Sequence, residues 1–274
     1  MAKGRSLHIG LNNLDPNHYG GWLGPLSACE NDASDMEAIA KSCGFQTDML
    51  LTIEATKKQV LAKISEAAKD LSSGDIFMFS YAGHGGKMQD LDQDELDRFD
   101  ETLCLYDEQL LDDELSLALS AFDEGVRILV ISDSCHSGTV TRGVEPVLVS
   151  QFPTASERKL QFRAMPIEVA IKTYEANREL YEQRKTRSGS ASGKIAASVI
   201  LISGCQDDQL ASDGWRNGLF TSCLLQVWDR GQFLGNYKSF CSRIAMLMPS
   251  SQTPNYYLTG QPNSAFEAQK PFTI

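Results

Sequence analysis

Two short segments of the chain combine a reactive side chain with flanking glycines. They are Tyr81-Ala82-Gly83-His84-Gly85-Gly86 and Asp133-Ser134-Cys135-His136-Ser137-Gly138. Each follows an apolar run typical of a buried strand, so we expect both at the carboxyl ends of strands, where open α/β sheets bind ligands. A histidine and a cysteine in neighbouring loops form a candidate base and nucleophile. Together the two segments predict a cysteine peptidase.

The chemistry of peptide cleavage assigns a role to each group. A cysteine peptidase needs an ionisable thiol, a base and donors for the oxyanion. Cys135 would supply the thiol and His84 the base. The backbone amides of Gly85 and Cys135 are the candidate oxyanion donors, because glycine lets the backbone approach a ligand closely. His136 is a rival base, but adjacent residues of an extended segment point to opposite sides.

The elements that must position these groups alternate between strand-like and helix-like. The predicted strands span 7–11, 45–51, 76–80, 127–132, 198–203 and 255–259. The predicted helices span 31–42, 56–71, 113–122, 219–228 and 237–247. This alternation is typical of a mostly parallel sheet with helices on both faces. We therefore expect an α/β fold.

One stretch, 154–194, breaks the alternation. It is polar and basic and ends in a Ser/Gly-rich run, which predicts a flexible, exposed linker. We expect a single domain, 1–274, in which this linker separates a larger portion, 1–153, from a smaller one, 195–274. The sequence assigns no chemistry to residues 140–183.

Composition narrows the class of partner. A net charge of −11 argues against nucleic acid or an anionic membrane and suits a basic peptide or protein substrate. The seven cysteines are scattered without metal-ligand spacing, so we expect no structural zinc. No signal peptide and no apolar run of about 20 residues is evident. We expect a soluble protein of a reducing cytoplasm.

The motifs closely resemble those of the metacaspases and their prokaryotic relatives, the orthocaspases, within the caspase-like clan CD cysteine peptidases of family C14. Besides the histidine and cysteine segments, the resemblance rests on 26–33, 90–103, 111–115, 202–209 and 218–221. It covers nearly the whole chain. It implies a caspase-like three-layer sandwich with a six-stranded, mostly parallel sheet, and a dyad of His84 and Cys135.

The resemblance also implies cleavage after arginine or lysine, with the basic side chain held by Asp32 and Asp133. Paired carboxylates suit a guanidinium or ammonium group. The residues alone leave a helix N-cap as the alternative role of Asp32. Many family members cut their own chain between the two portions. The candidate bonds for such self-processing follow Arg184, Lys185, Arg187 and Lys194.

An acidic run raises the question of a metal. The resemblance implies a calcium site at Asp100, Asp112 and Asp113, with a further carboxylate after the nucleophile. Arg142 stands near that last position, and a cation there opposes Ca²⁺ binding. The expected chemistry requires no cofactor, so calcium is the one candidate.

Two other kinds of protein remain as alternatives. One is a caspase-like scaffold without catalysis. The other is an effector that stays inactive without its small ligand or partner protein, as in bacterial cell death or defence. A serine hydrolase and a nucleotide-binding enzyme are disfavoured, since neither GxSxG nor GxGxxG spacing occurs at these glycines.

Overall fold

A computed structural model describes residues 2–89, 99–135, 161–189, 194–205, 209 and 211–274. Its centre is a six-stranded sheet in the order β2-β1-β3-β7-β8-β9. The strands are β1 (Gly4–Gly10), β2 (Gln46–Leu51), β3 (Ile76–Ala82), β7 (Arg127–Asp133), β8 (Ser198–Ser203) and β9 (Asn255–Gly260). All neighbours run parallel except β8 and β9. The expected caspase-like sheet is confirmed, and each predicted strand lies within a few residues of an observed one.

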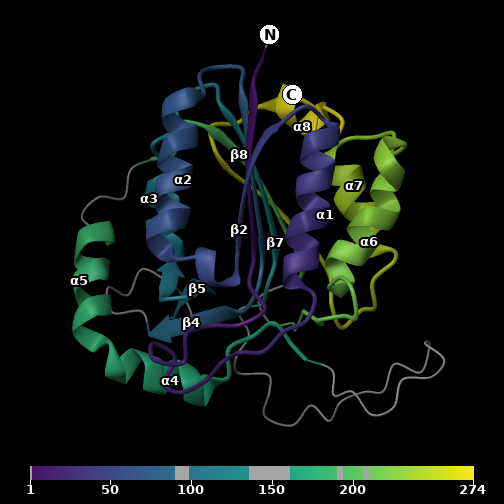
Figure 1. Cartoon of the computed structure of the whole chain (residues 1–274). Coiled ribbons are helices and arrows are strands. Elements are labelled where there is room, and N and C mark those ends of the chain that lie inside the picture. Colours follow the sequence, from purple (N-terminus) through teal and green to yellow (C-terminus); the bar gives the residue numbers. More distant parts are fainter. Residues whose placement is uncertain (1, 90–98, 136–160, 190–193, 206–208, 210) are drawn as a thin grey trace, which may run out of the picture.

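Helices cover both faces of this sheet (Figure 1). One face carries α1 (Cys29–Ser42), α6 (Leu219–Trp228) and α7 (Tyr237–Ala245), and the other carries α2 (Lys57–Asp70) and α3 (Asp112–Leu119). Because successive strand residues point to opposite faces, β3 contributes to both apolar layers. Phe77 and Phe79 pack on the side of α2, whereas Ile76 and Met78 pack on the side of α1.

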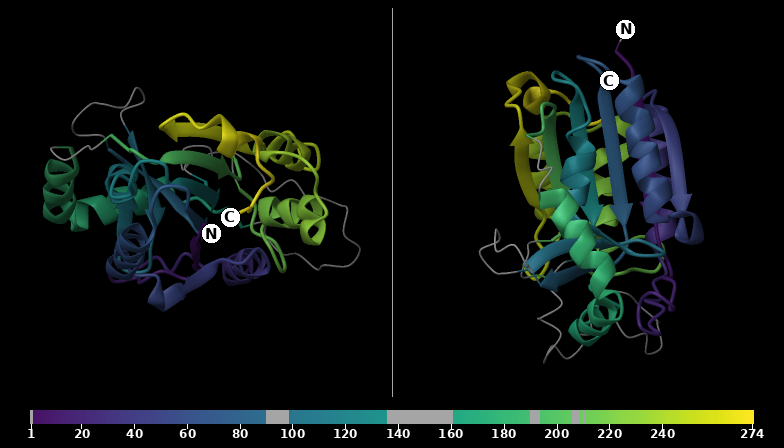
Figure 2. Two further views of the ribbon diagram at one scale, coloured as in Figure 1. Left: turned by 90° about the horizontal axis from the view of Figure 1, so that it is seen from above. Right: turned by 90° about the vertical axis from the view of Figure 1, so that its left-hand side faces the viewer.

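A second, antiparallel sheet lies at the carboxyl end of the central one (Figure 1). It consists of β4 (Gly85–Gln89), β5 (Phe99–Cys104) and β6 (Gln109–Leu111). The sequence did not predict it, because these short segments are rich in acidic and polar residues and lack a clear apolar alternation. The chain termini lie close together at the opposite end of the molecule (Figure 2).

The structure corrects the expectation of a flexible, exposed linker for the described residues 161–189. This stretch contains α4 (Ile167–Ala176) and α5 (Arg178–Gly189). Ala170 and Thr173 of α4 are buried, and Tyr181 of α5 packs with Met88 and Leu111. A few buried side chains thus anchor an otherwise polar sequence. The proposed division into a larger and a smaller portion stays a prediction.

The last helix of the chain is α8 (Ser264–Ala268), close to the C-terminus. Within the described ranges, none of the helices combines the length and the hydrophobicity that crossing a membrane requires.

Candidate active site

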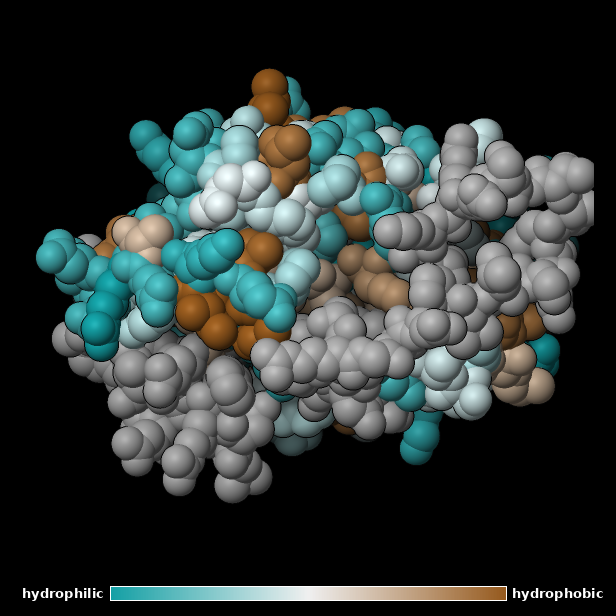
Figure 3. Space-filling model, turned by 90° about the horizontal axis from the view of Figure 1, so that it is seen from below, coloured by the Kyte–Doolittle hydropathy of each residue, from teal (hydrophilic) through white to brown (hydrophobic). Residues whose placement is uncertain are grey.

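The parallel register of β3 and β7 brings the two motif loops together. Ala82 pairs with Asp133 at the end of the ladder, and the Gly83 amide lies 3.5 Å from the Asp133 carbonyl oxygen. His84 and Cys135 therefore follow neighbouring strands at one edge of the sheet. Seen from this end, the described surface mixes apolar patches with polar side chains (Figure 3).

His84 is buried and held in one tautomer. Its Nε2 lies 3.1 Å from the Gly24 carbonyl oxygen, which can only accept, so Nε2 carries the proton and Nδ1 keeps a lone pair. Nδ1 is buried without a hydrogen-bond partner among the described residues. Burial lowers the pKa of His84 to about 4. The side chain is thus a neutral base with an available lone pair.

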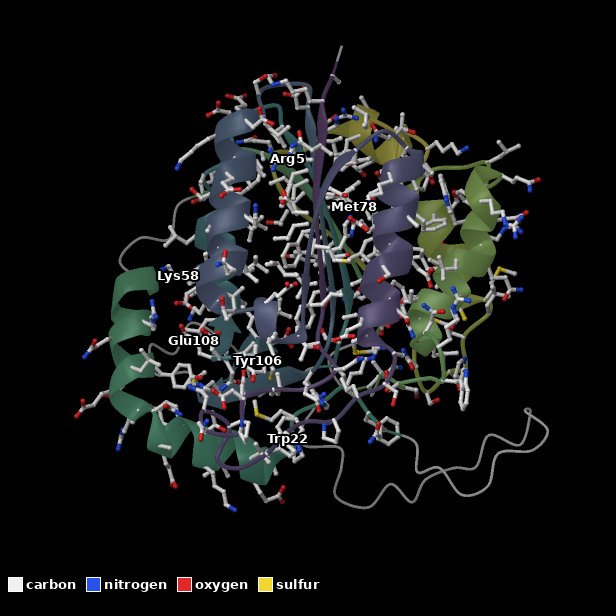
Figure 4. All side chains as sticks on the ribbon, in the orientation of Figure 1. Arg5, Trp22, Lys58, Met78, Tyr106 and Glu108 are labelled. Carbon is white, nitrogen blue, oxygen red and sulfur yellow. The ribbon has the colours of Figure 1, made fainter. Side chains whose placement is uncertain are left out.

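Two residues of the N-terminal loop fix this imidazole in place. The Trp22 ring packs against it with a centroid distance of 4.6 Å, and Figure 4 places Trp22 at the same end of the molecule. Gly24 adopts a φ of +52°, and a Cβ there would lie 3.1 Å from His84 Cδ2. Glycine is therefore suited to this position on both conformational and steric grounds.

Cys135 is fully buried in this state, and its thiol donates to the Gln209 carbonyl oxygen. A second thiol, that of Cys205, donates to the Ser134 carbonyl oxygen at 3.2 Å. A hydrogen bond with Cys135, together with burial, raises the pKa of Cys205. Cys205 therefore stays a protonated thiol beside Cys135. The rival base His136 lies outside the described residues.

An acidic pocket adjoins the two loops, and the guanidinium of Arg163 fills it. Arg163 Nη2 lies 2.5 Å from Asp32 Oδ2 and 2.9 Å from Asp213 Oδ1, and Nη1 lies 2.9 Å from Asp133 Oδ2. Asp32 belongs to the first turn of α1, whose N-cap residue is Ala28. The N-cap role for Asp32 is therefore wrong, and its carboxylate faces the pocket.

Charge pairing is strong because all these groups are buried. Burial raises the pKa of the Asp32 carboxyl to about 7, although Arg163 acts to lower it. For Arg163, burial alone would lower the pKa, but Asp133 and the other carboxylates raise it well above its usual value. Arg163 is thus a permanent cation in a pocket that is built for positive charge.

The backbone of Arg163 is held as firmly as its side chain. Its carbonyl oxygen accepts from the Gly85 amide at 2.9 Å and from the Cys135 amide at 3.1 Å. These are the two amides that the sequence analysis assigned to the oxyanion. Its own amide donates to the Ala211 carbonyl oxygen at 2.9 Å. The site can therefore bind a basic side chain and polarise the carbonyl that follows it.

Sequence reasoning missed both Asp213 and Arg163. Asp213 fixes the wall of the pocket, since its Oδ2 also accepts from the Ser27 amide at 2.7 Å. It lies in no recognisable motif. Arg163 does carry a signal, because it stands alone in the apolar context Phe162-Arg163-Ala164-Met165, where a buried charge needs a partner.

The predicted self-processing residues lie outside the acidic pocket. Arg184 belongs to α5 and pairs with Glu108 at 3.2 Å, and Lys185 and Arg187 belong to the same helix. Lys194 is exposed.

The predicted calcium ligands lie on two adjoining elements. Asp100 is in β5, with its side chain outside the described part, while Asp112 and Asp113 begin α3. Among the described side chains, no cluster of three or more His, Cys, Asp or Glu residues is suited to a metal ion. Arg142 lies outside the described residues. The calcium site stays a prediction.

The fold and the paired loops define the class of a cysteine-type peptidase. The family model of the caspase domain matches residues 13–266. The chain belongs to this caspase-domain family of cysteine peptidases.

Individual relatives agree with that assignment. The chain is 30% identical to Metacaspase-1 of Botryotinia fuckeliana over 243 residues, which cover 77% of this chain and 56% of the relative. It is 26% identical to Metacaspase-1 of Arabidopsis thaliana over 226 residues, which cover 75% of this chain and 55% of the relative. The chain thus spans little more than half the length of these curated relatives.

Solved structures share the fold. The crystal structure of protein GSU0716 from Geobacter sulfurreducens is 48% identical, covers 99% of both chains and has a TM-score of 0.88. Caspase-1 from Spodoptera frugiperda is 9% identical, with a TM-score of 0.50 over 94% of this chain and 86% of that one. The second likeness concerns the fold alone.

Proposed function

We propose that the chain is an endopeptidase that cleaves proteins after arginine or lysine, with Cys135 as nucleophile and His84 as base. One observation carries the proposal. The Arg163 guanidinium lies among three carboxylates while its carbonyl oxygen accepts from two loop amides. The residue before the scissile bond of a substrate would make these same contacts.

The acidic pocket supports a basic specificity. Arginine presents a planar fork that several carboxylates can grip at once, whereas lysine offers a compact charge on a flexible stem. We therefore expect both residues to be accepted, with arginine preferred. An aspartate in this pocket would face Asp32, Asp133 and Asp213 without a counter-charge, so cleavage after aspartate is not expected.

The chemistry follows from the tautomer of His84. Its Nδ1 lone pair takes the thiol proton as Cys135 Sγ bonds to the substrate carbonyl carbon. The amide bond then breaks, and the same proton passes to the departing nitrogen. Water, deprotonated by His84, hydrolyses the thioester and releases the new carboxylate and the free thiol.

The two loop amides stabilise the negative charge that develops on the carbonyl oxygen. Gly85 and Cys135 already donate to an oxygen at that place at 2.9 and 3.1 Å. One preorganised donor of this kind is worth about 2.7–4 kcal/mol of activation free energy. This geometry favours catalysis over the alternative of a scaffold without activity.

The filled pocket favours an enzyme whose activity is regulated. The proposal includes a role as an effector in bacterial cell death or defence. The enzyme would act in the cytoplasm on protein substrates. The proposal also includes Ca²⁺ binding by Asp100, Asp112 and Asp113. The ion would act by ordering the loops around the site.

The test is hydrolysis of fluorogenic peptides that end in Arg, Lys or Asp, with Ca²⁺ or a chelator. Wild type should cleave after Arg and Lys, and Cys135→Ala should lose at least about 10³-fold in kcat. Cys43→Ala, a thiol at the end of α1, is the matched control and should keep full activity. Cleavage only after Asp, or cleavage that survives Cys135→Ala, would contradict the proposal.

A further inference from the structure

Residues 161–165 lie in the site with β-type contacts on both sides of a bend at Arg163. The Asp213 amide donates to the Gln161 carbonyl oxygen at 2.9 Å, and the Met165 amide donates to the Gly85 carbonyl oxygen at 2.8 Å. Bridges of the β type join Phe162 to Ser212 and Ala164 to Gly85. Addition of a strand in this manner is a common way in which proteins bind extended peptides.

The side chain of Arg163 is enclosed on every side that the structure describes. It is fully buried. A Cβ added to Gly218 would lie 2.7 Å from Arg163 Cζ, so the absence of a side chain there makes room for the guanidinium. No other peptide can place a basic residue in this pocket while Arg163 fills it.

The bond between Arg163 and Ala164 has the surroundings of a bond about to be cut. Its carbonyl oxygen lies on the amides of Gly85 and Cys135. Ala164, whose nitrogen would leave, packs in one buried cluster with Cys135. The two candidate oxyanion donors and the residue that carries the nucleophile thus adjoin one peptide unit of the same chain.

The basic residues of α5 lack this presentation. Arg184, Lys185 and Arg187 belong to α5, so their backbone is helical and does not lie along the amides of Gly85 and Cys135 as that of Arg163 does. Cleavage after any of them would first require that the helix unfold. Arg163 needs no such rearrangement.

We propose that the chain cuts itself between Arg163 and Ala164, and that residues 161–165 keep other substrates out of the site until this cut is made. The inference rests on the proposed peptidase function. It replaces the α5 residues with Arg163 as the processing site.

Atoms balance in this self-cleavage without a co-reactant other than water. Cys135 Sγ bonds to the Arg163 carbonyl carbon, the bond to Ala164 N breaks, and the thiol proton reaches that nitrogen through His84. Hydrolysis of the thioester leaves one fragment ending in the Arg163 carboxylate and another beginning with the Ala164 amine.

The experiment follows the intact mass and the peptidase activity of the purified full chain over time. Wild type should yield fragments 1–163 and 164–274, and hydrolysis of an Arg peptide should rise in step with the cut fraction. Cys135→Ala should remain intact. Arg163→Gln should slow the cut by at least about a hundredfold, as expected for loss of a desolvated charge, yet hydrolyse the Arg peptide without a lag.

Two further variants sharpen the assignment. Arg184→Gln is the matched control and should be cut like wild type. Arg163→Lys should restore the cut at a reduced rate, because lysine keeps the charge but not the fork. If Arg163 had only a structural role, the rate of the cut would not fall in the order wild type, Arg163→Lys, Arg163→Gln.

The two proposals fail in different ways. Cys135-dependent cuts only at other basic residues, or full peptidase activity from an intact wild-type chain, would overturn self-cleavage after Arg163 and leave the peptidase standing. An intact, silent wild type beside an active Arg163→Gln would also overturn it, since the segment would then be an uncut inhibitor. Folded protein that neither cuts itself nor hydrolyses peptides in any variant would overturn both.

Discussion

Among the described residues, two basic side chains are buried between carboxylates, and only one of them lies in the candidate active site. Lys57, at the start of α2, is 1% exposed and lies 2.5 Å from Glu114 and 3.6 Å from Glu108. Figure 4 shows Glu108 at the side of the sheet where α2 and α5 lie. Arg163 is equally buried, among three aspartates. By charge and burial alone the two regions are alike.

The backbones distinguish them. Lys57 belongs to α2, so another peptide could take its place only if the helix unfolded, and its ammonium also donates to the Gln109 carbonyl oxygen at 3.1 Å. Arg163 lies on a non-helical segment whose backbone partners another peptide could use. A buried ion pair alone therefore does not identify a binding site. It indicates one when the charged residue lies on a segment that another peptide could replace.

Two buried histidines repeat the contrast. Both nitrogens of His8 have partners, Ser80 Oγ at 2.7 Å and Ser6 Oγ at 2.9 Å. His84 has one partner, and its Nδ1 has none among the described residues. The satisfied ring belongs to the core, while the other keeps a lone pair at the candidate active site.

The largest expected difference concerns stability. In a Cys135→Ala background, Lys57→Met should cost about 3–5 kcal/mol of unfolding free energy, because it strands buried carboxylates. Arg163→Met should cost less than half as much, because residues 161–165 can detach and let water reach the aspartates. Urea unfolding measures both. Equal losses would contradict the idea that the 161–165 segment is exchangeable.

Activity should show the reverse pattern. Asp213→Asn should lower kcat/KM for an Arg peptide about a hundredfold, since it removes a charge that is fully desolvated against the guanidinium. Glu114→Gln makes the same kind of change at Lys57 and should leave kcat/KM within about twofold. Steady-state kinetics on the two folded variants measures both effects. A similar loss of kcat/KM at both positions would contradict the distinction between the Arg163 and Lys57 regions.

The smallest effect concerns acid stability. Burial lowers the pKa of His8 to about 3, against the opposing effect of Glu37. The unfolded chain therefore binds this proton near pH 6.5 and the folded chain does not, so stability falls as the pH drops. By pH 5 the share of His8 is about 2 kcal/mol.

His8→Gln isolates that share, because the other titratable groups are common to both proteins. The stability difference between wild type and variant should shift in favour of the variant by this amount between pH 7.5 and pH 5 in urea unfolding. A pH-independent difference would mean that His8 is protonated in the folded core.

Much of the scaffold was predictable from local patterns. The central strands were found because alternating or continuous apolar runs report burial, and the parallel order of β3 and β7 follows from the helices between them. The assignment of the Gly85 and Cys135 amides to one oxygen also came from the sequence. Adjacent parallel strands bring the loops after them to a common edge.

Other elements had no adequate local signal. The sheet of β4, β5 and β6 is held by pairs such as Thr102 with Leu111, in segments too short and polar to be told from loops. The helices α4 and α5 lie in a sequence whose charge suggested a linker, and the burial of Tyr181 against residues far away in the chain stabilises them there.

The sequence by itself determined the reactive groups, the strands that carry them and the family to which they belong. Only the tertiary structure decided what fills the acidic pocket. Arg163 meets Asp32 across 131 residues, Asp213 across 50 and the Asp133 carbonyl oxygen across 30. Charge pairing acts through space and leaves no periodic trace along a chain, so these partners could be found only once the fold had brought them together.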